Sequence, residues 1–252
     1  MTAIERYGSG PTLLLLHGSP GGAQTWREIG KALAGRYSVV APTLPGHAPG
    51  EPATAQDTVD IAAATLSSLG KLSEPVTIGA HSFGAVIALQ MALSGKLDIA
   101  RLALFEPVAF GVLPGSGEQA AFDAAKPIFD RYATRQRAGD ADAVAIMADF
   151  WFGVGAFARM PPPVQGFMRQ QAAVNVRDVE AVFRDRYAPD ALKRLAMPTT
   201  IVYGDRSPAV ARLIAERLAA SLGNGRTVAL PGANHAMLNS HPEAVARLVA
   251  GD

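Results

Sequence analysis

A serine inside a short turn of small residues is the strongest chemical signal in this sequence. Residues 80–84 read Ala-His-Ser-Phe-Gly and directly follow the apolar run 76–79. This is close to the pattern G-x-S-x-G, in which a sharp strand-to-helix turn exposes a serine hydroxyl for nucleophilic attack. Ala80 replaces the first glycine but is also small, and Gly84 fills the last position. The pattern predicts that Ser82 is a nucleophile, and the alternative is a serine in an ordinary turn.

A histidine near the end of the chain is the best candidate for a general base. The sequence contains five histidines: His17, His47, His81, His235 and His241. Only His235 lies on a loop between the last apolar run and the final helical pattern, after the serine in the chain, which is where this arrangement needs its base. As the neighbour of Ser82, His81 is expected to point away from it, and His241 precedes a proline at the expected start of a helix.

A glycine-rich turn after an early apolar run could stabilise negative charge. Residues 17–22 read His-Gly-Ser-Pro-Gly-Gly and follow the leucine run 13–16. Such a turn can supply one backbone N–H to an oxyanion hole, while the residue after the nucleophile supplies the other. We therefore predict the N–H groups of Ser19 and Phe83 as donors. A phosphate-binding loop is the alternative, but neither G-x-G-x-x-G nor G-K-[ST] is present.

Short apolar runs alternate with helical patterns and must position these side chains. The runs cover residues 13–16, 37–41, 76–80, 102–105, 200–203 and 227–230, and helical periodicity covers 58–69, 209–222 and 243–249. Short apolar runs bounded by Gly or Pro are typical of buried parallel strands. The alternation predicts an α/β fold: a doubly wound, mostly parallel sheet with helices on both faces. Ligand sites in such sheets lie beyond the carboxyl ends of the strands.

One long segment interrupts the alternation. Residues 107–195 show helical patterns without a convincing strand, and they hold 11 of the 17 aromatic residues. We predict an inserted helical cap at 107–195 and a core made of residues 1–106 and 196–252. The aromatic side chains could line an apolar pocket, although the internal core of a small helical lobe would explain most of them.

The motifs together resemble those of the α/β-hydrolase superfamily. The His17 turn, the Ser82 turn and the loop 232–235 match that family in order and spacing, and residues 45–47, Pro-Gly-His, resemble its loop after the next strand. The resemblance covers nearly the whole chain. It implies a serine hydrolase with a Ser–acid–His triad, without a metal ion or organic cofactor.

The resemblance leaves two candidates for the acid. In many members the acid follows the next-to-last strand, three residues after a glycine, and counting from Gly204 places Ser207 there. Asp205 is close to that position. Other members, including a group of haloalkane dehalogenases, place the acid after the strand that follows the nucleophile helix, where this chain has Glu106. Because the usual position holds Ser207, which cannot act as the acid, we favour Glu106, with Asp205 as the alternative.

Composition excludes several classes of partner. The chain has 252 residues, a net charge of +1 and no cysteine. There is no electrostatic case for nucleic acid or an anionic membrane, and disulfides and thiolate metal sites are excluded. The amino-terminal residues lack a signal-peptide pattern, and no apolar run approaches the roughly 20 residues that span a bilayer. We expect a cytoplasmic monomer or homodimer that acts on a small molecule.

The expected reaction is hydrolysis of a carboxylic ester, lactone or thioester of a small apolar substrate through an acyl-enzyme. Trp26, Trp151 and Met237 are the candidate substrate-binding residues, because they lie in the cap or near the oxyanion turn and His235. A carbon–carbon bond hydrolase or a cofactor-free peroxidase would use the same side chains. A non-catalytic ligand-binding protein on this fold is a further alternative.

Overall fold

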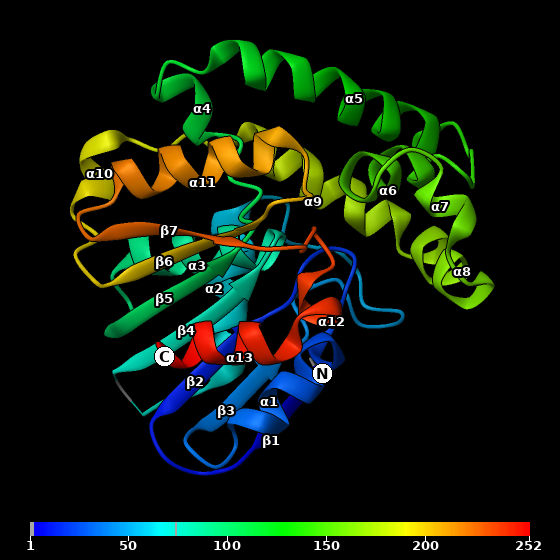
Figure 1. Ribbon diagram of the computed structural model, residues 1–252. Helices are drawn as coiled ribbons and strands as arrows, with labels where there is room; N and C mark the ends of the chain where they lie inside the picture. Colours follow the sequence, from blue (N-terminus) through cyan, green and yellow to red (C-terminus); the bar gives the residue numbers. More distant parts are fainter. Residues whose placement is uncertain (1–2, 74) are drawn as a thin grey trace.

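The computed structural model describes residues 3–73 and 75–252, and its centre is a seven-stranded sheet (Figure 1). The strands are β1 (Ile4–Tyr7), β2 (Thr12–Leu16), β3 (Ser38–Pro42), β4 (Val76–His81), β5 (Ile99–Phe105), β6 (Thr199–Gly204) and β7 (Gly225–Leu230). Their order is β1-β3-β2-β4-β5-β6-β7. Apart from β1, which is antiparallel to β3, all pairings are parallel. The predicted fold class is confirmed.

The strand order locates the functional edge of the sheet. From β2 the chain continues to β3 on one side, and then crosses to β4 on the other side of β2. Loops leave such a switch point in opposite directions and open a crevice at the carboxyl ends of the two strands. The glycine-rich turn follows β2 and the Ser82 turn follows β4, so both predicted motifs lie at this crevice.

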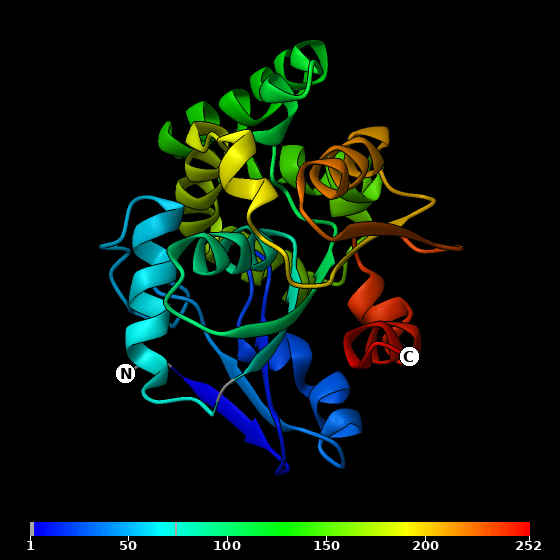
Figure 2. The same cartoon turned by 90° about the vertical axis from the view of Figure 1, so that its left-hand side faces the viewer.

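Helices cover both faces of the sheet and complete two hydrophobic cores. The core helices are η1 (Ala23–Trp26, a 3-10 helix), α1 (Arg27–Leu33), α2 (Thr58–Leu69), α3 (Phe83–Ser94), α11 (Ala209–Ser221), α12 (Met237–Ser240) and α13 (Pro242–Ala250). Figure 2 shows α2 on the opposite side of the sheet from α1 and α13. The leucine run of β2 serves both cores, because Leu14 and Leu16 face one and Leu13 and Leu15 face the other. Successive side chains of a strand point to opposite faces, so a fully apolar strand is buried on both.

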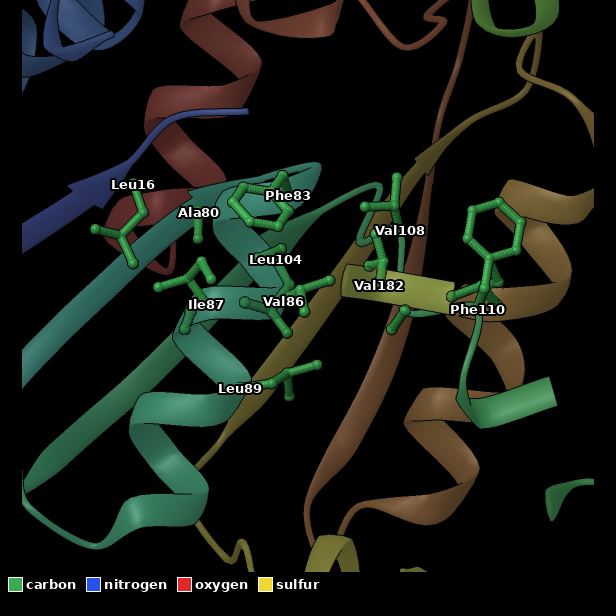
Figure 3. Packing of buried hydrophobic residues seen from close by; sticks show 14 of the residues in the cluster. Leu16, Ala80, Phe83, Val86, Ile87, Leu89, Leu104, Val108, Phe110 and Val182 are labelled. Carbon is green, nitrogen blue, oxygen red and sulfur yellow. The ribbon is translucent and has the colours of Figure 1, made fainter. Parts of the chain in front are cut away.

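The helix that follows the serine is almost entirely apolar, with Gln90 and Ser94 as its polar residues. Phe83, Val86, Ile87 and Leu89 of α3 are all buried against strands β4 and β5 and the residues beyond them (Figure 3). A helix that is hydrophobic all round must be surrounded by protein. This packing anchors the amino-terminal end of α3, and therefore the turn that carries Ser82.

Between β5 and β6 the described chain forms helices and no strand. These helices are α4 (Val112–Gly115), α5 (Gln119–Arg137), α6 (Val144–Phe152), α7 (Ala156–Arg159), α8 (Pro162–Gln170), α9 (Ala172–Arg184) and α10 (Pro189–Lys193). We call residues 107–195 the helical insertion. Helix α9 contacts α2 and α3, and α4 contacts α11, which joins the insertion to the core (Figure 1).

The sequence patterns did not predict β1. Its residues, Ile-Glu-Arg-Tyr, include two charged side chains and are mostly only half-buried. A strand at the edge of a sheet pairs on one side only and needs no continuous apolar run. A search for buried strands therefore passes over it.

Gly84 provides a test of how closely the serine turn packs on β2. A Cβ atom at this position would lie 2.4 Å from the His17 carbonyl oxygen and 2.5 Å from that of Leu16. Because backbone atoms cannot move aside cheaply, Gly84→Ala should destabilise the fold by about 3 kcal/mol, as overpacked core sites do. Urea unfolding followed by circular dichroism measures this. Gly166→Ala is the control, since a Cβ there meets nothing within 4 Å inside helix α8. It should leave stability unchanged or raise it by up to about 1 kcal/mol.

Candidate active site

The serine turn has the strained geometry of a nucleophile turn. Ser82 sits between β4 and α3 with φ 55° and ψ −120°, and it is nearly buried. Within residues 3–73 and 75–252, Ser82 and Glu106 are the two non-glycine residues with positive φ. Such conformations cost of order 1–3 kcal/mol each and persist where the surrounding structure imposes them. The two strained residues directly follow β4 and β5, at the same edge of the sheet.

A chain of hydrogen bonds links Ser82 to Glu106. The His235 Nε2 atom lies 3.0 Å from Ser82 Oγ, and its Nδ1 atom lies 2.6 Å from Glu106 Oε2. With Nδ1–H donating to the carboxylate, Nε2 is free to accept the serine proton. The three side chains come from the ends of β4 and β5 and from the loop after β7. Parallel strands deliver them to the same edge of the sheet.

The Glu106 carboxylate is held at both of its oxygens. Its Oε1 atom accepts the backbone N–H of Gly204 at 2.7 Å and the hydroxyl of Ser207. Burial raises the pKa of this carboxyl, but the hydrogen bond and charge of His235, with the bonds from Ser207 and Gly204, lower it more, and the net pKa falls. Glu106 is thus an ionised group whose second oxygen is fixed, so its first oxygen can orient His235.

Asp205, the alternative acid, lies elsewhere. It is exposed, and its Oδ1 atom accepts the backbone N–H of Gly232 at 2.8 Å, which ties the turn after β6 to the loop after β7. Ser207, three residues after Gly204, donates its hydroxyl to Glu106. The structure therefore brings Glu106, and not Asp205, to His235.

The predicted oxyanion donors flank the same crevice. Ser19 and Phe83 both line the cavity described below, and the peptide bond between Ser19 and Pro20 is cis. Gly18 packs closely on the serine turn, because a Cβ there would lie 3.0 Å from the Ser82 Cβ. The glycine-rich turn after β2 and the nucleophile turn after β4 are thus in direct contact.

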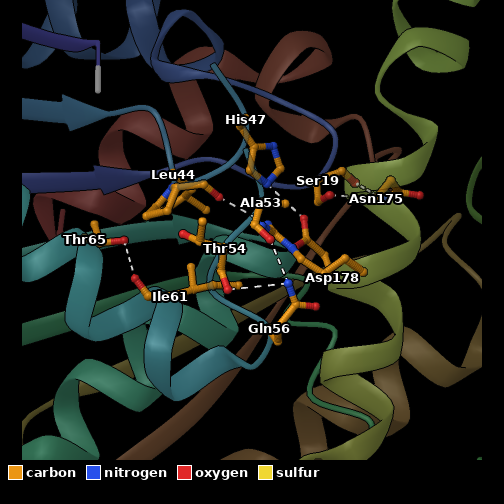
Figure 4. Close-up of polar contacts among 12 residues, drawn as sticks. Ser19, Leu44, His47, Ala53, Thr54, Gln56, Ile61, Thr65, Asn175 and Asp178 are labelled. Carbon is orange, nitrogen blue, oxygen red and sulfur yellow. Dashed lines mark hydrogen bonds and ion pairs between the residues drawn. The ribbon is translucent and has the colours of Figure 1, made fainter. Parts of the chain in front are cut away.

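Helix α9 of the insertion braces the glycine-rich turn. Asn175 Nδ2 donates to the Ser19 carbonyl oxygen at 3.0 Å and to Ser19 Oγ at 3.1 Å (Figure 4). One turn further along α9, Asp178 Oδ2 lies 2.9 Å from His47 Nε2, and its other oxygen binds Arg177. These buried bonds connect the insertion to the loops after β2 and β3.

The remaining buried histidines serve the backbone around the site. His17 Nδ1–H donates to the Gly18 carbonyl oxygen at 2.7 Å, and its Nε2 accepts the Leu44 N–H at 2.8 Å. His81 Nε2–H donates to the carbonyl oxygen of His235 at 2.9 Å. His81 thus binds the backbone of the loop that carries His235, while its ring lines the same cavity as Ser82.

A cavity of about 610 Å³ opens from Ser82 into the helical insertion. Its walls are mainly apolar and aromatic, with Phe110, Phe129, Met147, Trp151, Val182 and Phe183 from the insertion, and Ser82, His81 and His235 from the core. Drug-sized ligands occupy cavities of this size, and an apolar lining with a few convergent polar groups is the usual pattern. The arrangement suits a substrate whose polar reacting bond sits at Ser82 and whose apolar part extends under the insertion.

Of the three candidate substrate-binding residues, the structure places only Trp151 at this cavity. The prediction was wrong for Trp26 and Met237. Both are fully buried in the core on the α1 and α13 face of the sheet, where Trp26 packs on Phe105. The prediction chose them because they are close in sequence to the loops of Ser19 and His235. Trp26 ends η1 and Met237 begins α12, and both side chains are buried in the core. Asn175 and Asp178, which line the cavity, were not predicted. No local pattern marks them, because their partners lie more than 130 residues away in the chain.

No group of three His, Asp or Glu side chains in the described ranges could hold a metal ion. No helix among the same residues is long and apolar enough to cross a membrane.

Comparisons with known proteins identify the family. The model of the alpha/beta hydrolase family matches residues 13–248, so the chain belongs to this family. Among curated relatives, the magnesium-chelatase 30 kDa subunit of Rhodobacter capsulatus is 31% identical, with 80% of this chain and 72% of that protein covered. The pimeloyl-[acyl-carrier protein] methyl ester esterase of Aeromonas hydrophila is 27% identical, with coverage of 96% and 94%.

Solved structures share the fold at lower sequence identity. MenH from S. aureus superimposes with a TM-score of 0.79 at 19% identity and covers 100% of this chain and 97% of its own. An esterase from Exiguobacterium antarcticum gives a TM-score of 0.75 at 18% identity, with coverage of 99% and 94%. The chain is thus an alpha/beta hydrolase with esterases among its relatives.

The two neutral histidines of the site make stability depend on pH. Burial, reinforced by neighbouring histidines, lowers the pKa of His17 and of His81 to about 3. In the unfolded chain a histidine titrates near 6.5, so the unfolded state gains protons first as the pH falls. The stabilising effect is full above about pH 6.5 and is lost towards about pH 3, at about 1.4 kcal/mol per pH unit for each histidine.

Urea unfolding at pH 7.5, 6.5, 5.8 and 5.0 measures this slope before carboxylates contribute strongly. His81→Gln should reduce the slope by about half between pH 6 and 5, because only one of the two buried imidazoles remains. A wild-type free energy of unfolding that stays constant from pH 6.5 to 5.0 would contradict the assignment.

Proposed function

We propose that this protein is a serine hydrolase that cleaves carboxylic esters, lactones or thioesters with a small or medium-sized apolar acyl part. The observation that carries the proposal is the chain of contacts from Ser82 Oγ through His235 to Glu106, at the mouth of an apolar cavity. The esterases among the relatives and structural neighbours support the same class of reaction.

The proposed mechanism follows from the donors and acceptors of these side chains. His235 Nε2 accepts the proton of Ser82 as its Oγ attacks the carbonyl carbon, and Glu106 stabilises the imidazolium that forms. The N–H groups of Ser19 and Phe83 stabilise the oxyanion, and losing one such donor typically costs about 2.7–4 kcal/mol of barrier. The imidazolium then gives its proton to the leaving group. Water, activated by His235, releases the acid from Ser82.

The leaving group and the acyl part have different surroundings under this proposal. The deep wall, with Phe110, Phe129 and Phe183, takes the apolar acyl chain. The rim formed by α7 and α8 includes Arg159 and the half-exposed Phe167, and takes the part of the substrate that reaches solvent. A carboxylic acid product ionises on release and binds poorly to an apolar wall, which favours turnover.

Ser82→Ala tests the nucleophile. The variant should lose hydrolysis of p-nitrophenyl esters and labelling by a fluorophosphonate probe, because both need the Oγ atom, while circular dichroism and the melting temperature stay close to wild type. The probe adduct on the wild-type protein should map to the peptide with Ser82 by mass spectrometry. Labelling of another serine, or unchanged hydrolysis by Ser82→Ala, would refute the proposal.

Glu106→Gln and Asp205→Asn test the acid as a matched pair of isosteric changes. An amide in place of Glu106 favours the wrong tautomer of His235, so kcat for an ester should fall by orders of magnitude, about 10⁴-fold in the known precedent for such a swap. Asp205→Asn should keep kcat within about threefold of wild type, since Asp205 only accepts a bond from the Gly232 N–H. Equal losses in the two variants, or a larger loss in Asp205→Asn, would contradict the role of Glu106.

A further inference from the structure

Trp151 lies face to face with the imidazole of His235. The ring centroids are 4.2 Å apart and the ring planes differ by 18°, which is a stacked arrangement. The other aromatic contacts of Trp151 are not stacked, since Phe150 meets it at 87° and Phe110 at 54°. Aromatic pairs adopt both offset-stacked and edge-to-face arrangements. Among the aromatic contacts of Trp151, only the one with His235 is stacked.

The position of the indole is fixed by the insertion. Trp151 is buried near the end of α6, and the Asp149 carboxylate accepts the N–H groups of Gly155 and Phe157, each at 2.9 Å. These bonds tie the end of α6 to the start of α7. Phe129 and Phe150 pack around the indole from within the insertion. The ring cannot turn away from His235 without disturbing this cluster.

We propose that Trp151 is a positioning residue for His235, which keeps the imidazole aligned between Ser82 and Glu106 and stabilises its protonated form through the π face of the indole. The inference rests on the proposed function, because it concerns the base of that reaction. It assigns to the helical insertion a part in the proton transfer, in addition to its part in enclosing the substrate.

Of the aromatic rings that contact His235, the Trp151 indole is the one that stacks on the imidazole. Glu106 binds Nδ1 and Ser82 binds Nε2. The ring of His81 lies 4.8 Å away, and burial together with His235 lowers the pKa of His81 to about 3, so it adds no competing positive charge. Phe152 is more distant, at 6.0 Å and 55°. When the Ser82 proton moves to Nε2, the new positive charge lies between one carboxylate and one indole face.

A cation beside the face of an indole is stabilised electrostatically, and tryptophan is the best aromatic side chain for this purpose. The interaction is stronger in the imidazolium than in the neutral imidazole, so it acts on the state that forms as Ser82 attacks. The proton returns from Nε2 to the leaving group, and the stack is restored to its initial charge state. Removal of the indole should therefore slow the attack and make the imidazole harder to protonate.

The test measures the rate constant for fluorophosphonate labelling of Ser82 from pH 5 to 9 in Trp151→Leu, Trp151→Phe and Phe122→Leu. Leucine keeps the site apolar but has no π face, so labelling should slow about tenfold and the acid limb of the profile should move about 0.5 to 1 pH unit lower. Trp151→Phe should recover most of both effects. Phe122→Leu removes an aromatic ring of the insertion that packs on Phe183 and has no ring contact with Trp151 or His235, so its acid limb should stay at the wild-type position.

A slower Trp151→Leu whose acid limb stays in place would overturn the proposal and leave Trp151 as a cavity wall only. An NMR titration of the His235 ring in a Ser82→Ala background, with and without Trp151→Leu, gives a readout that needs no reaction. The imidazole signals should move at a lower pH in the Trp151→Leu protein, and coincident curves would also overturn the proposal. Wild-type protein that is not labelled at all would instead count against the proposed function, while the NMR comparison would still decide the role of Trp151.

Discussion

The carboxylate of Glu106 is the constraint on which the arrangement of the site depends. Its backbone has a positive φ of 43° immediately after the last residue of β5. One oxygen is anchored by Gly204 and Ser207, from the end of β6 and the turn beyond it, and the other binds the imidazole that follows β7. Three neighbouring parallel strands are thereby joined at their carboxyl ends. Because a buried carboxylate is costly unless its oxygens are all satisfied, these partners are required together.

The helical insertion has two roles that cannot be separated in this fold. Its aromatic side chains enclose the apolar cavity, and its α6 and α9 helices contact the loops of Ser19, His47 and His235 directly. Asn175 binds Ser19, Asp178 binds His47, and Trp151 stacks on His235. A change in the position of the insertion would therefore alter the geometry of the oxyanion turn and of the base, together with the shape of the cavity.

The two hydrophobic cores have different roles in the structure. The core on the α1 and α13 face is mainly aliphatic, with Trp26, Phe105 and Met237 inside it, and it supports the sheet from the face opposite α2 and α3. The other core runs from α2 and α3 into the insertion without a break, so that the packing around the nucleophile helix continues into the cavity wall. The chemistry and the choice of substrate therefore share one continuous hydrophobic core, and mutations deep in the insertion can affect both.

The sequence by itself determined the features that depend on local order. The apolar runs, the Ser82 turn and the loop of His235 predicted the mostly parallel sheet, because strand burial and strand-to-helix turns impose residue types within a few positions. The sequence did not predict β1, whose single pairing needs no apolar run, or the partners of the site that meet only in space. Only the tertiary structure shows that Glu106, held by Ser207, binds His235, and that Asp205 binds the Gly232 N–H instead. The exclusion of Trp26 and Met237 from the cavity was decided by the face of the sheet on which each side chain falls. The bracing by Asn175, Asp178 and Trp151 was decided by how the insertion folds back over β2, β3 and β7, through contacts between residues 84 to 156 positions apart. Such contacts depend on tertiary packing, and no local periodicity or spacing records them.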